Sequence, residues 1–289
     1  MNTVHSVEEL RAVVATWRRA GQTSAFVPTM GNLHEGHITL LRKAREMATR
    51  SVVSIFVNPI QFGRGEDYAR YPSTLDDDKA KLAAAGLDLL FAPNLDELYP
   101  GGIEEDTRVT VPGLSNILCG QFRPGHFSGV ATVVTKLLLN VQPDIALFGE
   151  KDYQQLLVIQ RMVRDLLMPV RVLGQPIVRE TDGLAMSSRN AYLNADERKL
   201  APMIFQTMNE AAAKLRAGRQ SVIAIETAGM ADLAAAGFRP EYLSVRRASD
   251  LSPPQRGDTR LQVLVAAWLG GARLIDNLRV ELDAPLALL

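Results

Sequence analysis

Two histidines three residues apart, His34 and His37, stand in the segment of the chain whose residue types most suggest chemistry. Their glycine-rich loop, Thr29–Gly36, lies between a short apolar run at Ser24–Pro28 and a helical pattern, so both imidazoles fall at a helix start. Backbone N–H groups there lack intrahelical partners and attract anions, and Gly36 lets a ligand approach the main chain. The pair predicts phosphate binding. The alternative is that one histidine caps the helix and the other is exposed.

A second loop, Gly149–Asp152, also joins an apolar run to a helical pattern. Lys151 could bring a mobile positive charge to a phosphate, and Asp152 could bind ribose hydroxyls or merely cap the helix, which is worth about 0.5–2 kcal/mol. Gln155 could reach a polar substrate or lie in solvent. The chain lacks G-x-x-x-x-G-K-[ST], and no G-x-G-x-x-G follows its first strand, so a nucleotide site here would use a different loop.

Three further segments carry polar residues at loop positions. Asn58–Phe62 follows an apolar run, and its amide side chains could bind a hydroxy acid or build an ordinary Asn-Pro turn. The serines and guanidinium of Met186–Asn190 suit phosphate oxygens, although such a small polar loop is also common without a ligand. Arg123 and His126 precede a helical pattern, where they could contact substrate or close the loop.

Metal binding has one candidate, the acidic run Asp76–Asp78. The run begins a helical pattern, and the helix dipole stabilises acidic residues in a first turn. A nucleotide-bound Mg²⁺ needs only one or two protein carboxylates, so Asp77 and Asp78 are kept as candidate ligands. The single cysteine, Cys119, excludes an intramolecular disulfide and a cysteine-rich zinc site.

Overall composition limits the class of partner. The chain has 289 residues, with 32 Lys and Arg against 32 Asp and Glu; a nucleic-acid partner is disfavoured because it requires a net basic face. The longest apolar run, 263–269, is too short to span a bilayer, and residues 1–20 lack an apolar signal core. We therefore expect a cytoplasmic protein without a membrane partner.

The elements that must position these loops follow from the spacing of apolar residues. Strands are predicted at 24–28, 51–57, 87–92, 145–148 and 170–178. Helices are predicted at 37–49, 75–85, 127–141, 152–166 and 6–20, the last with Ser6 as N-cap and Glu9 completing a capping box. Alternating strands and helices indicate a parallel sheet, whose ligands bind beyond the carboxyl ends of the strands.

The pattern changes after residue 178. Helices are predicted at 195–217 and 222–235, followed by strands at 242–246, 261–269 and 272–280. We therefore expect an α/β domain with a parallel sheet over residues 1–175 and a smaller α+β domain over residues 176–289.

Five segments, taken in order, resemble the pantoate–β-alanine ligase family. They are PTMGNLHEGH at 28–37, FVNPIQFGRGEDYARYP at 56–72, RPGHFSGVATVVTKLL at 123–138, FGEKDYQQL at 148–156 and DGLAMSSRNAYL at 182–193. The first segment alone indicates only the wider superfamily of nucleotidyl transferases and class I tRNA synthetases. Five ordered segments are far more specific. Ser73 and Ala191 stand where family members often carry Arg and Gly.

The resemblance implies an ATP-dependent ligase that uses Mg²⁺. In the family, the pantoate carboxylate attacks the α-phosphorus of ATP and expels pyrophosphate, and the pantoyl adenylate then reacts with the amine of β-alanine to give pantothenate and AMP. The resemblance also implies a homodimer, with a Rossmann-like N-terminal domain and a smaller C-terminal lid.

Site residues carry over by position from the resemblance. His34, His37, Lys151 and Arg189 are the catalytic candidates, with His37 usually marked as proton donor. Gln61 and Gln155 would bind pantoate, Gln61 also lying near β-alanine, and Arg123 is a further candidate for substrate binding. The implied ATP-binding residues are Met30, Gly31, Asn32, Leu33, His34, Glu35, Gly36, His37, Gly149, Glu150, Lys151, Asp152, Val178, Met186, Ser187, Ser188 and Arg189. No strong general base is expected, because the pantoate carboxylate is already ionised.

Three other functions compete with this interpretation. An adenylyltransferase acting on a phosphate acceptor would share the histidine loop but would not need the Asn58–Phe62 segment. A non-catalytic nucleotide-binding subunit is disfavoured by the intact Lys151 and Arg189. A tRNA-binding synthetase fragment is disfavoured by the balanced charge.

Overall fold

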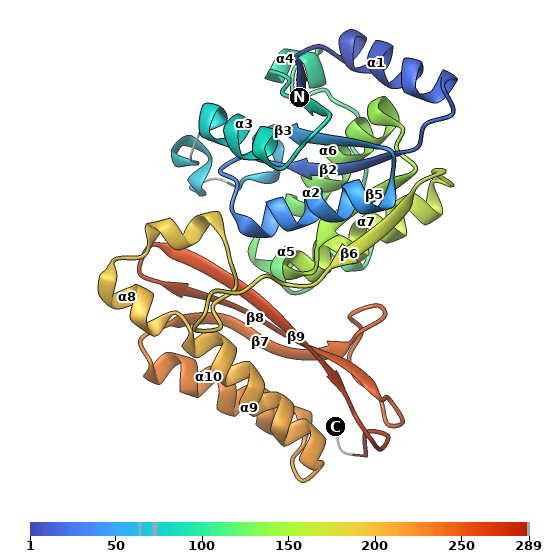
Figure 1. Ribbon diagram of the computed structural model, residues 1–289. Helices are drawn as coiled ribbons and strands as arrows, with labels where there is room; N and C mark the ends of the chain where they lie inside the picture. Colours follow the sequence, from blue (N-terminus) through green and yellow to red (C-terminus); the bar gives the residue numbers. More distant parts are fainter. Residues whose placement is uncertain (64, 72–73, 288–289) are drawn as a thin grey trace. The chain divides into compact units, whose positions relative to one another are not determined.

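The chain forms two compact units, shown in the computed structural model of Figure 1, which describes residues 1–63, 65–71 and 74–287. The first unit comprises residues 1–150 and 155–176, and the second comprises 151–154 and 177–289. The chain therefore crosses between the units near residues 150, 154 and 176, and only the last crossing lies beside the boundary expected from the sequence. Ser73 lies outside the described residues.

A parallel sheet of six strands forms the centre of the first unit. Its order is β1-β4-β3-β2-β5-β6, and every neighbouring pair is parallel. The strands are β1 (Asn2–Val4), β2 (Ser24–Thr29), β3 (Arg50–Ile55), β4 (Leu89–Phe91), β5 (Ile145–Gly149) and β6 (Arg171–Gln175). The parallel α/β fold predicted from alternating strands and helices is confirmed.

Helices cover both faces of this sheet (Figure 1). Strand residues alternate between the faces: Ala25 and Val27 join a core with α2, whereas Phe26, between them on β2, is buried but does not belong to that core. The longer helices are α1 (Val7–Arg19), α2 (Glu35–Met47), α3 (Leu75–Ala84), α6 (His126–Val141) and α7 (Tyr153–Asp165). The short ones are η1 (Pro59–Gln61), η2 (Asp67–Arg70), α4 (Leu95–Leu98), η3 (Leu114–Asn116), α5 (Cys119–Phe122) and η4 (Glu150–Asp152).

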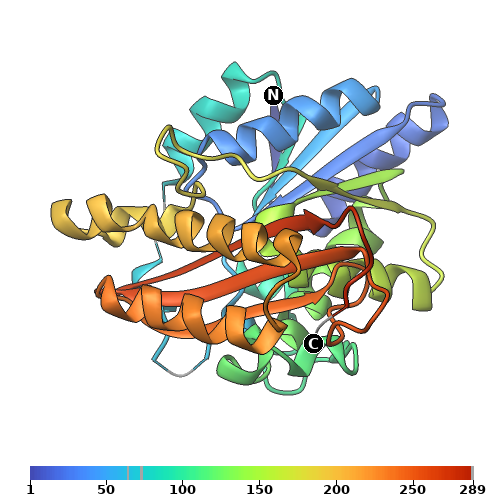
Figure 2. The same cartoon turned by 90° about the horizontal axis from the view of Figure 1, so that it is seen from below.

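The second unit is an antiparallel sheet of order β7-β8-β9 with helices along it (Figure 2). Its elements are η5 (Ser188–Tyr192), α8 (Ala195–Leu200), α9 (Met203–Ala217), α10 (Val222–Ala235), β7 (Arg239–Arg247), β8 (Arg260–Leu269) and β9 (Ala272–Glu281). Glu241 on β7 accepts hydrogen bonds from Trp268 Nε1 of β8 at 2.7 Å and Arg273 Nη2 of β9 at 2.6 Å, which ties the three strands together. The predicted α+β arrangement is confirmed.

Several predicted element bounds need correction: the strand expected at 170–178 ends at Gln175, and the strand expected at 242–246 begins at Arg239. The helix expected at 195–217 is broken into α8 and α9 around Pro202, because proline has no N–H to donate and its ring clashes with the preceding turn. The helix expected at 37–49 begins earlier, at Glu35, with His34 as its N-cap. The capping box of Ser6 and Glu9 is confirmed. Among the described residues, no helix combines the length and the apolar character that crossing a bilayer requires.

Candidate active site

The loops after β2 and β5 lie at the point where the strand order reverses. The chain runs from β2 outward through β3 and β4, and then returns to place β5 on the opposite side of β2. In open parallel sheets this reversal leaves a crevice beyond the carboxyl ends of the two central strands. Residues 30–34 and 149–150 therefore flank the expected ligand crevice of the first unit.

Both histidines of the first loop use Nδ1 to accept main-chain hydrogen bonds. Gly36 N–H donates to His34 Nδ1 at 3.2 Å, and His34 N–H donates to His37 Nδ1 at 3.3 Å. The ring centroids are 4.1 Å apart. An imidazole that accepts at Nδ1 carries its proton on Nε2 when neutral, so each ring has an Nε2–H donor. His34 is thus the helix cap that the sequence left open as an alternative, and capping also fixes which nitrogen donates.

Asp78 holds the loop that precedes the histidines through hydrogen bonds. Its side chain is fully buried and accepts from the N–H groups of Asn32 and Leu33, both at 2.8 Å, and from the Thr74 hydroxyl at 3.2 Å. Lys81 Nζ donates to the Leu33 carbonyl at 2.8 Å. The first turn of α3 therefore fixes the main chain of this loop.

The predicted metal ligands Asp77 and Asp78 differ in their surroundings. Asp78 already accepts from three protein donors, whereas Asp77 is exposed. Within the described part of the chain, no three His, Cys, Asp or Glu side chains are grouped as a metal site would require. Metal binding at Asp77 and Asp78 stays a prediction, and the observed contacts of Asp78 are those of a loop anchor.

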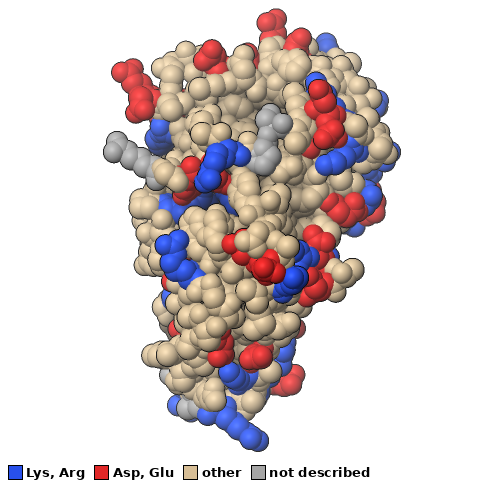
Figure 3. All heavy atoms as spheres, turned by 90° about the vertical axis from the view of Figure 1, so that its left-hand side faces the viewer, with Lys and Arg blue, Asp and Glu red and all other residues tan. Residues whose placement is uncertain are grey.

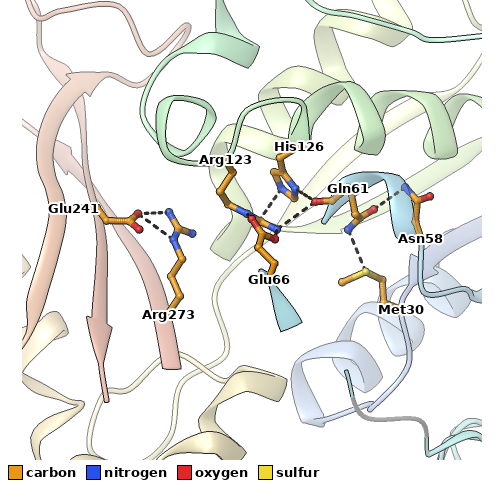
Figure 4. Close-up of polar contacts among 8 residues, drawn as sticks. All are labelled: Met30, Asn58, Gln61, Glu66, Arg123, His126, Glu241 and Arg273. Carbon is orange, nitrogen blue, oxygen red and sulfur yellow. Dashed lines mark hydrogen bonds and ion pairs between the residues drawn. The ribbon is translucent and has the colours of Figure 1, made fainter. Parts of the chain in front are cut away.

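Gln61 contacts the first loop through Met30 (Figure 4). Its Nε2 lies 3.1 Å from Met30 Sδ, and its Oε1 accepts from Asn58 Nδ2 at 3.1 Å. Both Gln61 and Asn58 are buried. A residue implied for pantoate and a residue implied for ATP are thus brought together. Gln155 lies half-buried at the start of α7.

Arg123 supports the backbone of Gln61. Its guanidinium pairs with Glu66 through Nε at 2.8 Å and Nη2 at 2.5 Å, and Nη2 donates to the Gln61 carbonyl at 3.3 Å. That carbonyl also accepts from His126 Nδ1 at 2.7 Å, and Arg123 Nη1 donates to His126 Nε2 at 3.1 Å. Burial opposes ionisation of Glu66, but the Arg123 hydrogen bond and charge hold its pKa below the usual value. These contacts close the loop; substrate binding by Arg123 stays a prediction.

The remaining predicted ATP residues belong to the second unit, except Gly149 and Glu150. Asn277 Nδ2 donates to the Lys151 carbonyl at 2.9 Å, and a cavity of about 10 Å³ is lined by residues that include Lys151, Ser187 and Asp276. That volume is at the lower limit for a single water molecule. The second unit therefore brings the Lys151 loop and the Ser187 turn together. A crevice shared by these residues and His37 stays a prediction.

Asp276 lines the same small cavity as Lys151. It is buried and pairs with Arg179 at 2.6 and 2.9 Å. Burial raises the pKa of Asp276, against the lowering effects of Arg179 and of the Lys151 charge. No sequence motif singled out Asp276, although two polar residues, Asp276 and Asn277, inside an apolar strand pattern are a usable signal. Tyr99, which contacts Asn58, has no local signal in the sequence.

Comparisons with known proteins agree along nearly the whole chain. The sequence profile of the family described as pantoate-beta-alanine ligase matches residues 2–279. The pantothenate synthetase of Azotobacter vinelandii is 55% identical over 282 residues, covering 98% of this chain and 100% of that protein. That of Pseudomonas entomophila is 56% identical over 283 residues, covering 98% and 99%.

Solved structures show the same likeness. The pantothenate synthetase of Thermus thermophilus superposes with a TM-score of 0.89 at 50% identity, covering 96% of this chain and 99% of that one. The pantoate-beta-alanine ligase of Francisella tularensis, complexed with beta-gamma ATP and beta-alanine, has a TM-score of 0.81 at 33% identity and covers 96% and 97%.

Proposed function

The chain belongs to the pantoate–β-alanine ligase family and is a ligase, and we propose that it joins pantoate to β-alanine through a pantoyl adenylate formed from ATP. The observation that carries the proposal is the contact between Gln61 and Met30, because it joins the pantoate candidate to the histidine loop. The balanced charge of the surface is consistent with small-molecule substrates: on the face shown in Figure 3, basic and acidic side chains lie interspersed.

The proposed reaction has two steps. A carboxylate is a poor acyl donor because its leaving group would be oxide. Attack of a pantoate carboxylate oxygen on the α-phosphorus of ATP forms the P–O bond of an acyl adenylate and expels pyrophosphate. The amine of β-alanine then attacks the acyl carbon, loses a proton to solvent, and AMP leaves with the oxygen that came from pantoate. Each step needs two anionic or polar reactants to be aligned, and this positioning contributes much of the acceleration beside electrostatic stabilisation.

The residues supply donors for the charge that develops on phosphate. The Nε2–H groups of His34 and His37 and the start of α2 provide donors on the first unit. We assign Lys151 and Arg189, with the remaining ATP candidates of the second unit, to the same triphosphate. His37 is assigned to phosphate contact, because its Nδ1 is already used by the backbone of His34.

Mg²⁺ fits this donor set as an ion carried by ATP. Mg²⁺ normally keeps several waters and takes one or two protein carboxylates together with substrate phosphates. The exposed carboxylate of Asp77 meets that requirement, whereas Asp78 is engaged by the loop. When bound, the ion would neutralise phosphate charge. The use of ATP also favours a cytoplasmic location.

We further propose a homodimer. The segment between α7 and the edge strand β6 exposes apolar side chains: Leu166 is 52% and Leu167 88% exposed, and Leu167 lines a groove together with Val170 and Val172. An edge strand with an apolar margin is a surface that a second copy can cover. Sedimentation of the wild type and of Leu167→Glu tests this. We expect a dimer whose dissociation constant rises in the variant, and a monomeric wild type would contradict it.

Isotope exchange tests the reaction itself. With labelled pyrophosphate, the enzyme should exchange label into ATP only when pantoate is present, without β-alanine. Pantoate carrying ¹⁸O in its carboxylate should transfer one ¹⁸O to AMP when β-alanine is added. Exchange driven only by a phosphorylated acceptor would instead establish an adenylyltransferase. Lys151→Ala should sharply reduce exchange while the unfolding transition is retained, because Lys151 lies in the three-residue helix η4 and alanine keeps the main-chain carbonyl that Asn277 contacts.

A further inference from the structure

The side-chain amide of Gln61 is held in one orientation by a chain of hydrogen bonds that starts at a main-chain carbonyl. The Gly129 carbonyl can only accept, so the Asn58 atom that faces it at 3.1 Å is the nitrogen Nδ2. The same nitrogen lies 3.1 Å from the Gln61 side chain, which must therefore present its oxygen Oε1. The other end of Gln61 is its NH₂ group, which is a donor.

Tyr99 holds the opposite end of Asn58. Its hydroxyl donates to Asn58 Oδ1 at 2.8 Å, and its side chain is 1% exposed. Burial, followed by the charge of Asp106, raises the pKa of the phenol well above its usual value, so the donor keeps its proton. Lys136 lies 4.3 Å from the ring centroid, and its Nζ donates to Asp106 at 2.5 Å. The phenol is therefore a permanent donor in a fixed place.

Close approach of α6 to η1 makes the arrangement possible. A Cβ at Gly129 would lie 2.6 Å from the Ile60 carbonyl oxygen and 2.8 Å from Gln61 Cα, which are distances that real side chains do not adopt. Glycine at this position thus allows its own carbonyl to reach Asn58. The Gly129 carbonyl fixes the donor-to-acceptor direction of this series of hydrogen bonds. Tyr99 completes the series by donating to Oδ1 of Asn58.

We propose that Tyr99 and Asn58 are positioning residues that keep the Gln61 amide turned as a hydrogen-bond donor toward pantoate. The inference rests on the proposed role of Gln61 in pantoate binding. The carboxylate of pantoate can only accept hydrogen bonds. If the Gln61 amide were rotated by 180°, its oxygen would face that carboxylate, and two acceptors would repel each other. Tyr99 acts through Asn58 and needs no contact with substrate.

Steady-state kinetics of Tyr99→Phe tests the proposal, with Tyr242→Phe as control. Phenylalanine keeps the ring and removes only the donor, leaving Asn58 Oδ1 buried without its partner. We expect the KM for pantoate to rise about tenfold, the effect of losing one buried hydrogen bond, while the KM for ATP stays within about twofold. Tyr242 is half-buried on β7, and its variant should leave both constants unchanged.

A double-mutant cycle separates positioning from a general structural effect. In a Gln61→Ala background, Tyr99→Phe should have no further effect on the KM for pantoate, because the group that it positions is gone. The same fold-increase in both backgrounds, or an equal rise in the KM for ATP, would overturn the proposal. An unchanged KM for pantoate in Gln61→Ala would also overturn it. A wild type without pantoate-dependent exchange would refute the proposed function separately.

Discussion

Replacement of Asp78 by asparagine should both destabilise the protein and weaken ATP use. The carboxylate accepts two main-chain N–H groups at 2.8 Å in a fully buried place. Asparagine keeps one acceptor oxygen and turns an NH₂ group toward the other N–H, which leaves that donor unsatisfied. One buried unsatisfied donor costs about 1–3 kcal/mol, and the loss of the charge in the remaining bond adds about 1 kcal/mol. We expect a total loss of about 2–4 kcal/mol.

Part of that loss appears as loop opening, because Asn32 and Leu33 are held by this side chain. If the ordered loop falls to about one tenth of the population, the apparent affinity for ATP falls about tenfold. Urea unfolding measures the stability, and initial rates at varied ATP measure the KM. Asp76→Asn, an exposed residue of the same turn, is the matched control and should cost less than about 1 kcal/mol.

An unchanged free energy of unfolding in Asp78→Asn would contradict the inference that Asp78 anchors the loop at Asn32 and Leu33. If the variant instead kept its stability but required more Mg²⁺, Asp78 would be a metal ligand, as the sequence left open.

Two further predictions concern the loops around Gln61 and Lys151. The pKa of Glu66 is lower in the folded protein than its ordinary value of 4.5. Its ion pair with Arg123 therefore stabilises the protein at pH values above 4.5, and this stabilisation is lost as the pH falls through the pKa of the folded state. The stability difference between wild type and Glu66→Gln should therefore shrink below about pH 4.5 in urea titrations, and a constant difference would contradict it. Asn277→Leu removes the donor to the Lys151 carbonyl, so pantoate-dependent exchange should fall about tenfold at low ATP. Recovery of full rate at saturating ATP would indicate positioning, whereas an unchanged rate at low ATP would contradict it.

Local patterns predicted the scaffold, but long-range polar contacts stayed hidden. The capping box at Ser6 follows from two residues three positions apart, and helix α10 was bounded by apolar spacing and its flanking residues. The Pro202 break was also visible in the sequence, since proline inside a helical pattern interrupts it. The contact between Tyr99 and Asn58 joins residues 41 positions apart, and nothing local distinguishes that tyrosine from any other buried aromatic.

The site itself was predicted in the same uneven way. The loops after β2 and β5 follow from the parallel sheet, which places them at one edge. The orientation of each side chain does not follow, because it depends on which partner satisfies it. Arg123 illustrates the point: its charge suggested a substrate, and its partner Glu66 is a carboxylate of the same chain.

The four residues 151–154 have a consequence for dissecting the molecule. They are the last two residues of η4 and the first two of α7, yet Asn277 donates to the Lys151 carbonyl, and Tyr153 donates to the Ala248 carbonyl at 2.8 Å. A fragment that ends at residue 176 would keep residues 151–154 but lose their partners Asn277 and Ala248. The complementary fragment would lose the contact that the buried Asn277 of β9 makes with Lys151. Exchanging this half between relatives therefore requires transplanting two separate stretches of chain, because a graft at a single junction would leave a foreign tetrapeptide seated against the new strand.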